Sequence, residues 1–275
     1  MGNVNFSVSM CTYGGDNADW LKTAIESILN GTVKPAEVVL VVDGPVPDEI
    51  DTVIKNYETD PIFKVIRLKE NIGHGEARRT GLNNCSNELV ALMDSDDISA
   101  PDRFQKQLRL FENDTELAIV GGNITEFIDN AENIVGKRVV PQSDSEIKEY
   151  LKERCPMNQM TVMFKKESVA TAGGYIDWFC DEDYYLWIRM YLAGMKFANL
   201  PDTLVNVRVG KEMYNRRGGL KYFKSEAKLQ KYMLDNKIIG FGTYFMNVAK
   251  RLIVQVLLPN KLRGWVFKKF ARVKN

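Results

Sequence analysis

The chain has 275 residues, of which 45% are hydrophobic and 27% charged, with a formal net charge of +1. This length and composition suit one large α/β domain, or one domain with an appendage, and exclude a disordered, collagen-like or disulfide-scaffold protein. Four cysteines without a CxxC pair and a single histidine, His74, argue against a Cys/His zinc site and fit a reducing compartment. Neither a secretory signal nor an apolar run of 18 residues is visible, so we expect a cytoplasmic protein without a spanning helix.

The first hundred residues alternate between strand and helix patterns. A helix is expected at 17–31, where apolar residues recur with helical spacing until Gly31. The β-branched run at 38–42 is typical of a strand covered on both faces, and Pro101 suits the first turn of a later helix. The alternation predicts a parallel sheet with helical crossovers. The other expected strands are 5–10, 63–68 and 89–93, and the other expected helices are 48–57 and 75–85.

The pattern loosens after about residue 118. We expect a break at Gly173-Gly174, a helix at 182–192, and two or three helices beyond residue 222. Strands are expected at 118–122 and 161–164, with a mixed segment at 200–209. The predicted organisation is a catalytic domain over 1–220 and a basic helical extension over 221–275.

The C-terminal extension carries an unbalanced positive charge. Residues 236–275 contain no Asp or Glu and nine of the 37 basic residues, which leaves 28 basic and 36 acidic residues elsewhere, a net charge of −8. Aromatic and aliphatic residues interleave with these cations, so the segment could lie in a membrane interface. It could equally cap the catalytic core with its lysines solvated. Nucleic acid would suit the charge, but no nucleic-acid-binding module accompanies it, so none is expected as a partner.

Polar clusters follow three of the expected strands. In a parallel sheet, ligands bind beyond the carboxyl ends of the strands. Carboxylates as crowded as those after residue 93 repel one another unless a cation or solvent screens them, and Mg²⁺ or Mn²⁺ prefers such oxygen ligands together with substrate phosphates. A plain turn explains the same residues, so both interpretations stay open. The clusters are Cys11-Thr12-Tyr13, Asp43-Gly44 and Asp94-Ser95-Asp96-Asp97.

Several further motifs occur in a fixed order between about residues 6 and 210. They are Ser7-Val8-Ser9-Met10-Cys11-Thr12-Tyr13, Ala24-Ile25-Glu26-Ser27-Ile28-Leu29, Val41-Val42-Asp43-Gly44, Asn71-Ile72-Gly73 with Ala77-Arg78 and Gly81, Asp94-Ser95-Asp96-Asp97, Gly173-Gly174-Tyr175, and Glu182-Asp183-Tyr184-Tyr185-Leu186-Trp187. In this order they resemble glycosyltransferase family 2. The resemblance implies the GT-A nucleotide-sugar-binding fold, an α/β fold with a mostly parallel mixed central sheet, here with a C-terminal helical extension.

The resemblance assigns a nucleotide-binding role to most of these polar residues. It implies that Thr12 and Asp43 contact the nucleotide base, with Tyr13 against the base or ribose. Asp43 as a plain turn residue remains an alternative. The remaining implied roles are Arg78 facing the nucleotide, Asp94 on the ribose, Asp96 on a divalent Mn²⁺ or Mg²⁺ ion, and Ser95 and Glu182 in substrate binding.

Asp183 is the general base that the resemblance implies. An inverting transfer displaces the nucleoside diphosphate in one step, and the attacking hydroxyl must lose its proton to a positioned carboxylate. The alternative is structural, because acidic residues at a helix N-terminus interact favourably with the helix macrodipole. Both roles can hold together.

The sequence also departs from the family pattern. Val42 stands where the family often has an acid, and Cys11 replaces the opening proline. Gln159 occupies a place where relatives often carry histidine, and it can neither act as a base nor bind a metal strongly. His74, in a glycine loop, is assigned no role.

The resemblance implies an inverting transferase that moves a sugar from a nucleoside-diphosphate sugar, with UDP-sugar expected. The acceptor would be a glycan or a polyprenyl-diphosphate-linked oligosaccharide of surface polysaccharide biosynthesis, at the inner face of the membrane. The turn Arg216-Arg217-Gly218-Gly219 is the expected contact for the acceptor diphosphate. Two other functions stay open: a catalytically silent sugar-nucleotide or glycan-binding protein, and a metal-dependent nucleotidyltransferase. Intact Asp96 and Asp183 argue against the first, and Gly14-Gly15 is too short for the phosphate loop of the second.

Overall fold

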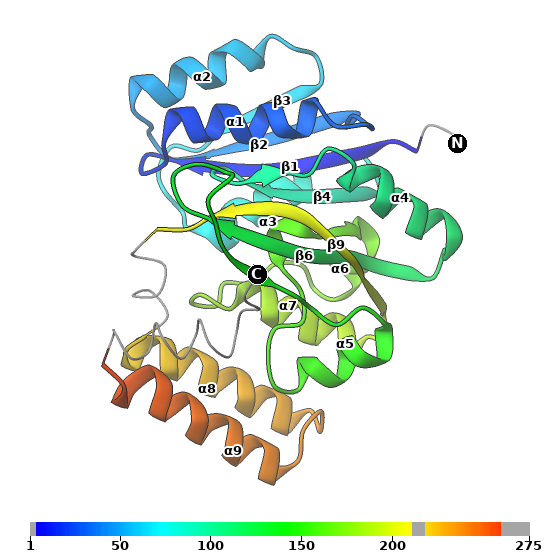
Figure 1. Cartoon of the computed structure of the whole chain (residues 1–275), viewed down its shortest axis with the longest axis vertical. Helices are drawn as coiled ribbons and strands as arrows, with labels where there is room; N and C mark the ends of the chain where they lie inside the picture. The colour runs from blue at the N-terminus through cyan, green and yellow to red at the C-terminus, as the bar shows by residue number, and fades with distance from the viewer. Residues whose placement is uncertain (1–3, 211–217, 260–275) are drawn as a thin grey trace.

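A mixed β-sheet flanked by helices forms the body of the molecule (Figure 1). The computed structural model describes residues 4–210 and 218–259. The strand order is β3-β2-β1-β4-β8-β6-β9-β5, with β7 paired to β6. The strands are β1 (Phe6–Tyr13), β2 (Glu37–Asp43), β3 (Phe63–Arg67), β4 (Leu89–Asp94), β5 (Ile98–Ser99), β6 (Leu117–Phe127), β7 (Ile134–Arg138), β8 (Met163–Lys165) and β9 (Lys196–Arg208).

The helices form layers on both faces of this sheet. In Figure 1, α1, α2 and α4 lie above the sheet, α3, α5, α6 and α7 lie below it, and α8 and α9 form an outer layer at the bottom. The helices are α1 (Ala18–Leu29), α2 (Asp48–Glu58), α3 (His74–Asn84), α4 (Arg103–Asn113), α5 (Asp144–Leu151), α6 (Lys166–Thr171), α7 (Glu182–Leu192), α8 (Leu220–Asp235) and α9 (Phe241–Leu252), with a 3-10 turn at Gln159–Thr161 and a π-helical turn at Ile253–Leu257.

The parallel half of the sheet brings the polar clusters to one edge. Strand β1 pairs in parallel with both β2 and β4, which places Tyr13 opposite Asp43 and Cys11 opposite Asp94. The expected strand–helix alternation over the first hundred residues is confirmed. The second half is mixed, because β8 runs antiparallel to β4 and to β6, whereas β6 and β9 are parallel.

Local signals account for the helices that were predicted well. Helix α1 begins after Asn17, whose side chain accepts a hydrogen bond from the backbone N–H of Trp20 at 3.1 Å, and its buried face is the predicted apolar one. Helix α7 has the predicted bounds, and the break before it contains Gly173 and Gly174, both at positive φ. These agreements follow from strong periodicity and clear end signals.

Several details differ from the sequence-based expectations. Pro101 lies outside α4, since Asp102 is the N-cap and the helix starts at Arg103. The segment expected to be mixed belongs to β9, a 13-residue strand pairing with β6 over most of its length. Helix α5 was missed although Ser143 and Glu146 form a capping box, because only two of its residues, Ile147 and Leu151, are buried.

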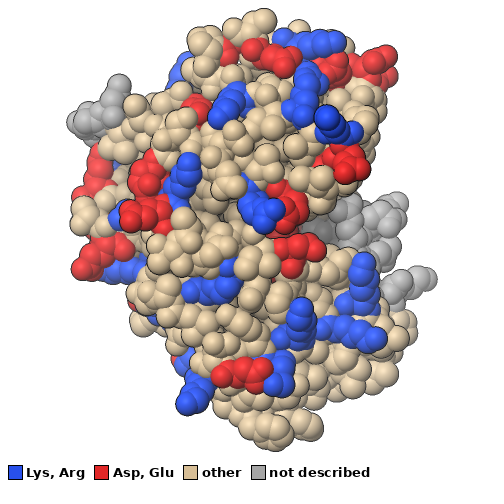
Figure 2. Space-filling view, turned by 180° about the vertical axis from the view of Figure 1, so that it is seen from behind, with Lys and Arg blue, Asp and Glu red and all other residues tan. Residues whose placement is uncertain are grey.

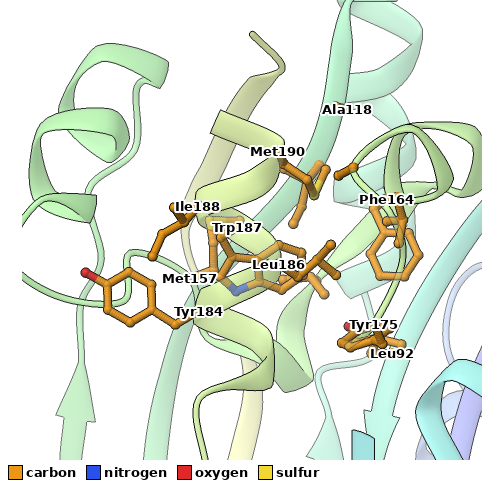
Figure 3. Packing of buried hydrophobic residues seen from close by; sticks show 14 of the residues in the cluster. Leu92, Ala118, Met157, Phe164, Tyr175, Tyr184, Leu186, Trp187, Ile188 and Met190 are labelled. Carbon is orange, nitrogen blue, oxygen red and sulfur yellow. The ribbon is translucent and has the colours of Figure 1, made fainter. Parts of the chain in front are cut away.

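Two hydrophobic cores lie on the two faces of the sheet. The core above contains the buried faces of α1, α2 and α4. The core below is built around Trp187 of α7, which is fully buried among Leu186, Met190 and Phe164 (Figure 3). Leu229 and Met233 of α8 belong to the same lower core. The division into parts at residue 220 stays a prediction.

Helix α9 is amphipathic in an unusual sense. Its side facing the protein is polar: Asn247 is buried and donates to the Lys152 carbonyl at 3.0 Å, and Arg251 pairs with Glu226 at 2.8 Å. Several of its apolar side chains face outward, with Phe241 72% and Phe245 61% exposed, whereas Tyr244 packs against the lower core. No described helix is both long and apolar enough to cross a bilayer.

Candidate active site

A pocket of about 480 Å³ lies at the carboxyl edge of β1, β2 and β4. A larger hollow beside α5 contains none of the predicted site residues. Asp183 and Glu182 are not among the residues lining the pocket. The predicted residues that do line it are Thr12, Tyr13, Asp43, Arg78, Asp94, Ser95 and Asp96.

Asp16 connects the cluster at the end of β1 with the acidic cluster that follows β4. One of its carboxylate oxygens, Oδ2, accepts hydrogen bonds from the Thr12 hydroxyl at 2.9 Å and from the Ser95 hydroxyl at 2.7 Å. The backbone N–H of Tyr13 donates to the same oxygen at 3.3 Å. Asp16 therefore fixes the end of β1 against the loop after β4, and Tyr13 remains 46% exposed at the pocket.

Asp43 holds the loop that precedes α3. Its Oδ1 accepts from the Ile72 backbone N–H at 2.7 Å, and its Oδ2 accepts from the Gly73 N–H at 3.2 Å. Gly44, with φ +88, allows this approach, because a Cβ there would lie 2.6 Å from the Asn71 nitrogen. The base contact stays a prediction beside this structural role. Asp43 lines the pocket, and each carboxylate oxygen can accept a further hydrogen bond.

Arg78 joins the two halves of the candidate site. Its guanidinium is buried and lies 2.9 Å from a carboxylate oxygen of Asp94 and 3.2 Å from one of Glu182. Burial opposes its positive charge, but Asp94 and Glu182 outweigh that effect and raise the pKa of Arg78. Arg78 is thus a fixed cation that links the pocket to the N-terminus of α7.

The acidic cluster after β4 divides into residues with different environments. Asp97 is buried and accepts from the Arg208 backbone N–H at 2.9 Å, which anchors the end of β9. Burial raises the pKa of Asp97 well above its usual range, and Asp96 and Asp94 add to the rise. Asp97 is therefore a structural residue.

Asp96 lines the pocket and lies among other carboxylates. Burial raises the pKa of Asp96 to about 6, and the neighbouring Asp94 and Asp16 contribute to the rise. A divalent cation would relieve that crowding of negative charge. Within residues 4–210 and 218–259, no three His, Cys, Asp or Glu side chains form a metal cage. The residues fit a cation held by a carboxylate together with nucleotide phosphates, as Mg²⁺ commonly is.

Asp183 lies at the first turn of α7, next to the Glu182 that contacts Arg78. Its Oδ1 accepts from the Tyr184 backbone N–H at 2.7 Å, and the Cys155 thiol lies 3.9 Å from its Oδ2. The adjacent Asp181 is buried, and burial, Glu226 and Asp183 together raise the pKa of Asp181 to about 8. Asp183 is half-buried, whereas Asp181 is buried.

The sequence matches the family model "Glycosyl transferase family 2" over residues 7–170, and "Glycosyl transferase family group 2" over residues 89–258. An uncharacterized glycosyltransferase of Haemophilus influenzae is 40% identical over 273 residues, covering 98% of this chain and 100% of the relative. The chain belongs to glycosyltransferase family 2. It is an enzyme, a glycosyltransferase, so the silent-protein and nucleotidyltransferase alternatives lose their support.

Two further relatives of this glycosyltransferase have named activities. The "Amylovoran biosynthesis glycosyltransferase AmsE" of Erwinia amylovora is 34% identical over 266 residues, covering 96% of this chain and 98% of the relative. The "UDP-Gal:alpha-D-GlcNAc-diphosphoundecaprenol beta-1,3-galactosyltransferase" of Escherichia coli is 36% identical over 267 residues, covering 97% and 96%.

Solved structures confirm the GT-A fold of the glycosyltransferase. S. aureus TarS in complex with UDP-GlcNAc superposes with a TM-score of 0.66 at 17% identity, covering 90% of this chain and 72% of TarS. The mannosyltransferase PcManGT from Pyrobaculum calidifontis, in complex with GDP-Man and Mn²⁺, gives 0.61 at 16% identity, covering 94% and 71%. These likenesses show the fold.

Sequence reasoning missed several residues of the glycosyltransferase site. Asp16, Trp20 and His74 line the pocket, and His74 lies beside Arg78, which together with burial lowers the pKa of His74 to about 4. The Arg208 guanidinium lies 4.6 Å from the ring centroids of both Trp20 and Phe127 and donates to the Asp96 carbonyl at 3.2 Å. Only Asp16 had a local signal, its place four residues after Thr12. Gln159 is buried beside the site without a resolved role.

Proposed function

We propose that this glycosyltransferase transfers a sugar from a UDP-sugar, with inversion, to a lipid-linked acceptor of surface polysaccharide biosynthesis. The observation that supports it most is the position of Arg78, which contacts Asp94 on the pocket side and Glu182 beside Asp183. These two contacts join Arg78 to residues that follow it in the sequence by 16 positions and by 104 positions. They couple a nucleotide pocket to a candidate base.

The pocket suits a nucleoside diphosphate. Tyr13 and Trp20 supply exposed aromatic surface for a base or ribose, and Asp94 and Asp43 supply acceptors for ribose hydroxyls and the base. Arg78 also lines the pocket, but Asp94 and Glu182 already pair with its charge, so a diphosphate there requires a further cation. A divalent cation, when bound at Asp96, supplies neutralisation of the charge that develops on the leaving diphosphate.

Asp183 is proposed to take the proton of the acceptor hydroxyl as that oxygen attacks the anomeric carbon. The bond from carbon to the diphosphate oxygen breaks as the new glycosidic bond forms, so one displacement inverts the configuration. The backbone N–H of Tyr184 fixes the Asp183 carboxylate through Oδ1, and the Cys155 thiol lies 3.9 Å from Oδ2. The donor and acceptor named for the Escherichia coli relative are of these classes.

A donor panel tests this function. UDP-sugars with Mn²⁺ are expected to raise the melting temperature, since a ligand that binds only the folded state stabilises it, whereas GDP-, CMP- and dTDP-sugars are not. With the stabilising donor and a lipid-diphosphate acceptor, nuclear magnetic resonance of the product should show an inverted anomeric configuration. Stabilisation by a different nucleotide class, or a product with retained configuration, would refute the corresponding part of the proposal.

We also propose that the enzyme works on the inner face of the membrane, with α9 lying in the interface. The outward side of α9 is apolar, and residues 236–275 carry nine basic residues and no acidic ones. Apolar insertion combined with attraction to anionic lipids is how interfacial helices bind. Part of this basic segment, residues 260–275, and the predicted contacts Arg216 and Arg217 lie outside the described residues.

Replacing both Phe241 and Phe245 with serine is expected to weaken binding to vesicles that contain anionic lipid by roughly tenfold or more, because each exposed phenyl ring loses its apolar burial in the interface. Vesicle co-sedimentation measures this. The matched control replaces Ile134 and Val135 of β7, which are also exposed, with serine and should bind vesicles like wild type. Equal sedimentation of both double variants would refute the role of α9.

A further inference from the structure

A surface beside α7 combines lysines with aromatic rings and is not explained by the donor pocket. Lys221, Lys224 and Lys228 follow one another along α8 at spacings of three and four residues, which places them on one side of the helix. The Lys221 ammonium lies 3.9 Å from the ring centroid of Phe179, and that of Lys228 lies 4.3 Å from the ring of Trp178. These five residues are called the lysine–aromatic surface below.

The three lysines of this surface have no salt-bridge partner within the part of the chain that the structure describes. By contrast, Lys231, one turn further along, pairs with Asp235 at 2.5 Å. The acid within the same stretch of α8, Glu226, is held by Arg251 at 2.8 Å and by Gln255 at 2.5 Å. Figure 2 shows Lys and Arg side chains on the lower part of the rear face, where α8 and α9 lie in Figure 1, as well as over the upper part. The three ammonium groups can therefore form ion pairs with a bound anion.

Apolar side chains adjoin these cations. Phe179 and Ile176 are 41% and 42% exposed, and Leu220, at the start of α8, is 60% exposed. Exposed apolar groups beside unpaired ammonium groups match a ligand that has both a polyanionic and a hydrocarbon part. A nucleotide lacks the hydrocarbon, and a neutral glycan lacks both.

The surface is also fixed close to the candidate base. Ser225 of α8 donates its hydroxyl to the Phe179 carbonyl at 2.6 Å, and the Trp178 indole donates to the Ser225 carbonyl at 3.3 Å. The ring of Trp178 packs 4.3 Å from that of Tyr185, two residues after Asp183. Phe179 precedes Asp183 by four positions, so their Cα atoms are at most about 14 Å apart.

We propose that the lysine–aromatic surface binds the diphosphate and the first prenyl unit of a lipid-linked acceptor. The inference rests on the proposed function, since it supplies the acceptor subsite for that reaction. In an acceptor whose first sugar carries the diphosphate, the attacking hydroxyl and the diphosphate lie on one ring. When the hydroxyl of the acceptor lies at Asp183, we expect the diphosphate of the same sugar to lie on the side of α8. The lysines then act as positioning residues, and Asp183 does the chemistry.

Binding of geranyl diphosphate tests the subsite without requiring transfer. The full chain is titrated in the presence of a chelator, which removes metal-dependent binding at the donor pocket. The tryptophan fluorescence change that a Trp178→Phe variant lacks reports the contact at Trp178, because the chain has three other tryptophans. Replacing Lys221, Lys224 and Lys228 together with alanine is expected to weaken binding roughly tenfold or more, because three charge-assisted contacts are lost. Geraniol, which lacks the diphosphate, should bind weakly and equally to both proteins.

The control variant replaces Lys22, Lys34 and Lys55, exposed lysines at the opposite end of the molecule, with alanine. It removes the same charge and should change the dissociation constant by less than about twofold. Equal affinity of the α8 triple variant and wild type would overturn the proposal. So would loss of binding to phosphatidylglycerol vesicles with unchanged binding of geranyl diphosphate, which would assign the surface to phospholipid headgroups.

A transfer assay separates this inference from the proposed function. With an alkyl-diphosphate-linked N-acetylglucosamine acceptor, the α8 triple variant should show a raised acceptor KM with donor KM and kcat near wild type. With the neutral alkyl glycoside of the same sugar, the KM should not change. If wild type transfers the sugar and the variant has the same acceptor KM, the subsite alone is refuted. If wild type transfers no sugar from any UDP-sugar, the proposed function is refuted. The binding experiment then decides whether the subsite exists.

Discussion

Replacing Asp96 with asparagine is expected to lower kcat/KM about a thousandfold, because charge neutralisation of a leaving diphosphate contributes several kcal/mol to the transition state. The amide keeps the shape of the side chain but loses the negative charge that would hold the cation. Metal-dependent stabilisation by UDP should disappear with it. Steady-state rates and thermal unfolding with and without Mn²⁺ measure the two effects.

The control for this change is Asp102→Asn. Asp102 follows Asp96 by six residues and is the N-cap of α4, but it does not line the pocket and pairs with Lys106 at 2.7 Å. Its replacement should leave the rate and the metal effect near wild type. An Asp96→Asn protein that still gains stability from UDP only when Mn²⁺ is present would show that the cation binds elsewhere.

Replacing Asp183 with asparagine is expected to lower kcat by about a hundredfold to ten-thousandfold, the usual contribution of a general base. Asparagine can still accept the hydrogen bond from the Tyr184 N–H, so α7 should keep its start. The KM for the donor should change little, because Asp183 does not line the nucleotide pocket. Initial rates over a range of donor concentrations separate kcat from KM.

Asp48→Asn is a matched control for the structural alternative. Asp48 is the first residue of α2 and, like Asp183, contributes negative charge to the first turn of a helix. Loss of that charge costs about 0.3–1 kcal/mol of stability and should leave transfer intact. If Asp183→Asn behaves like Asp48→Asn, with a small loss of stability and full activity, Asp183 is only a helix-terminal residue.

Local patterns predicted the parts of the fold and site that depend on neighbouring residues. The apolar spacing and the Asn17 cap define α1, and the buried strands β2 and β4 end at the acids that line the pocket. The family motifs then identified Arg78 and Glu182 as site residues, and the structure brings them into contact. The role of each residue in binding or catalysis stays a prediction.

Contacts between distant segments could not be predicted in this way. Ser95 lies 79 residues from Asp16, and Arg208 lies 111 residues from Asp97, so no periodicity or spacing links either pair. Neither Asp16 nor Arg208 was predicted to belong to the site. The first contact follows from the parallel pairing of β1 with β4, and the second from the antiparallel pairing of β5 with β9.

The C-terminal helix shows the same limit. Its aromatic and basic residues left two interpretations open, an apolar face in a membrane interface and a cap on the protein core. In the structure the polar side faces inward, because Asn247 bonds to Gln230 at 2.8 Å and Gln255 to Glu226, both within α8. The partner helix decides which side of an amphipathic helix is buried. The sequence pattern of one segment carries no information about that partner.

The division of binding and chemistry between Asp96 and Asp183 is tested most directly by calorimetric titration of UDP with Mn²⁺ into wild type, Asp96→Asn and Asp183→Asn. We predict that Asp183→Asn binds UDP as wild type does while its transfer rate is lost, and that Asp96→Asn loses the metal-dependent part of binding. Equal loss of UDP binding in both variants, or metal-dependent binding retained in Asp96→Asn, would contradict this division.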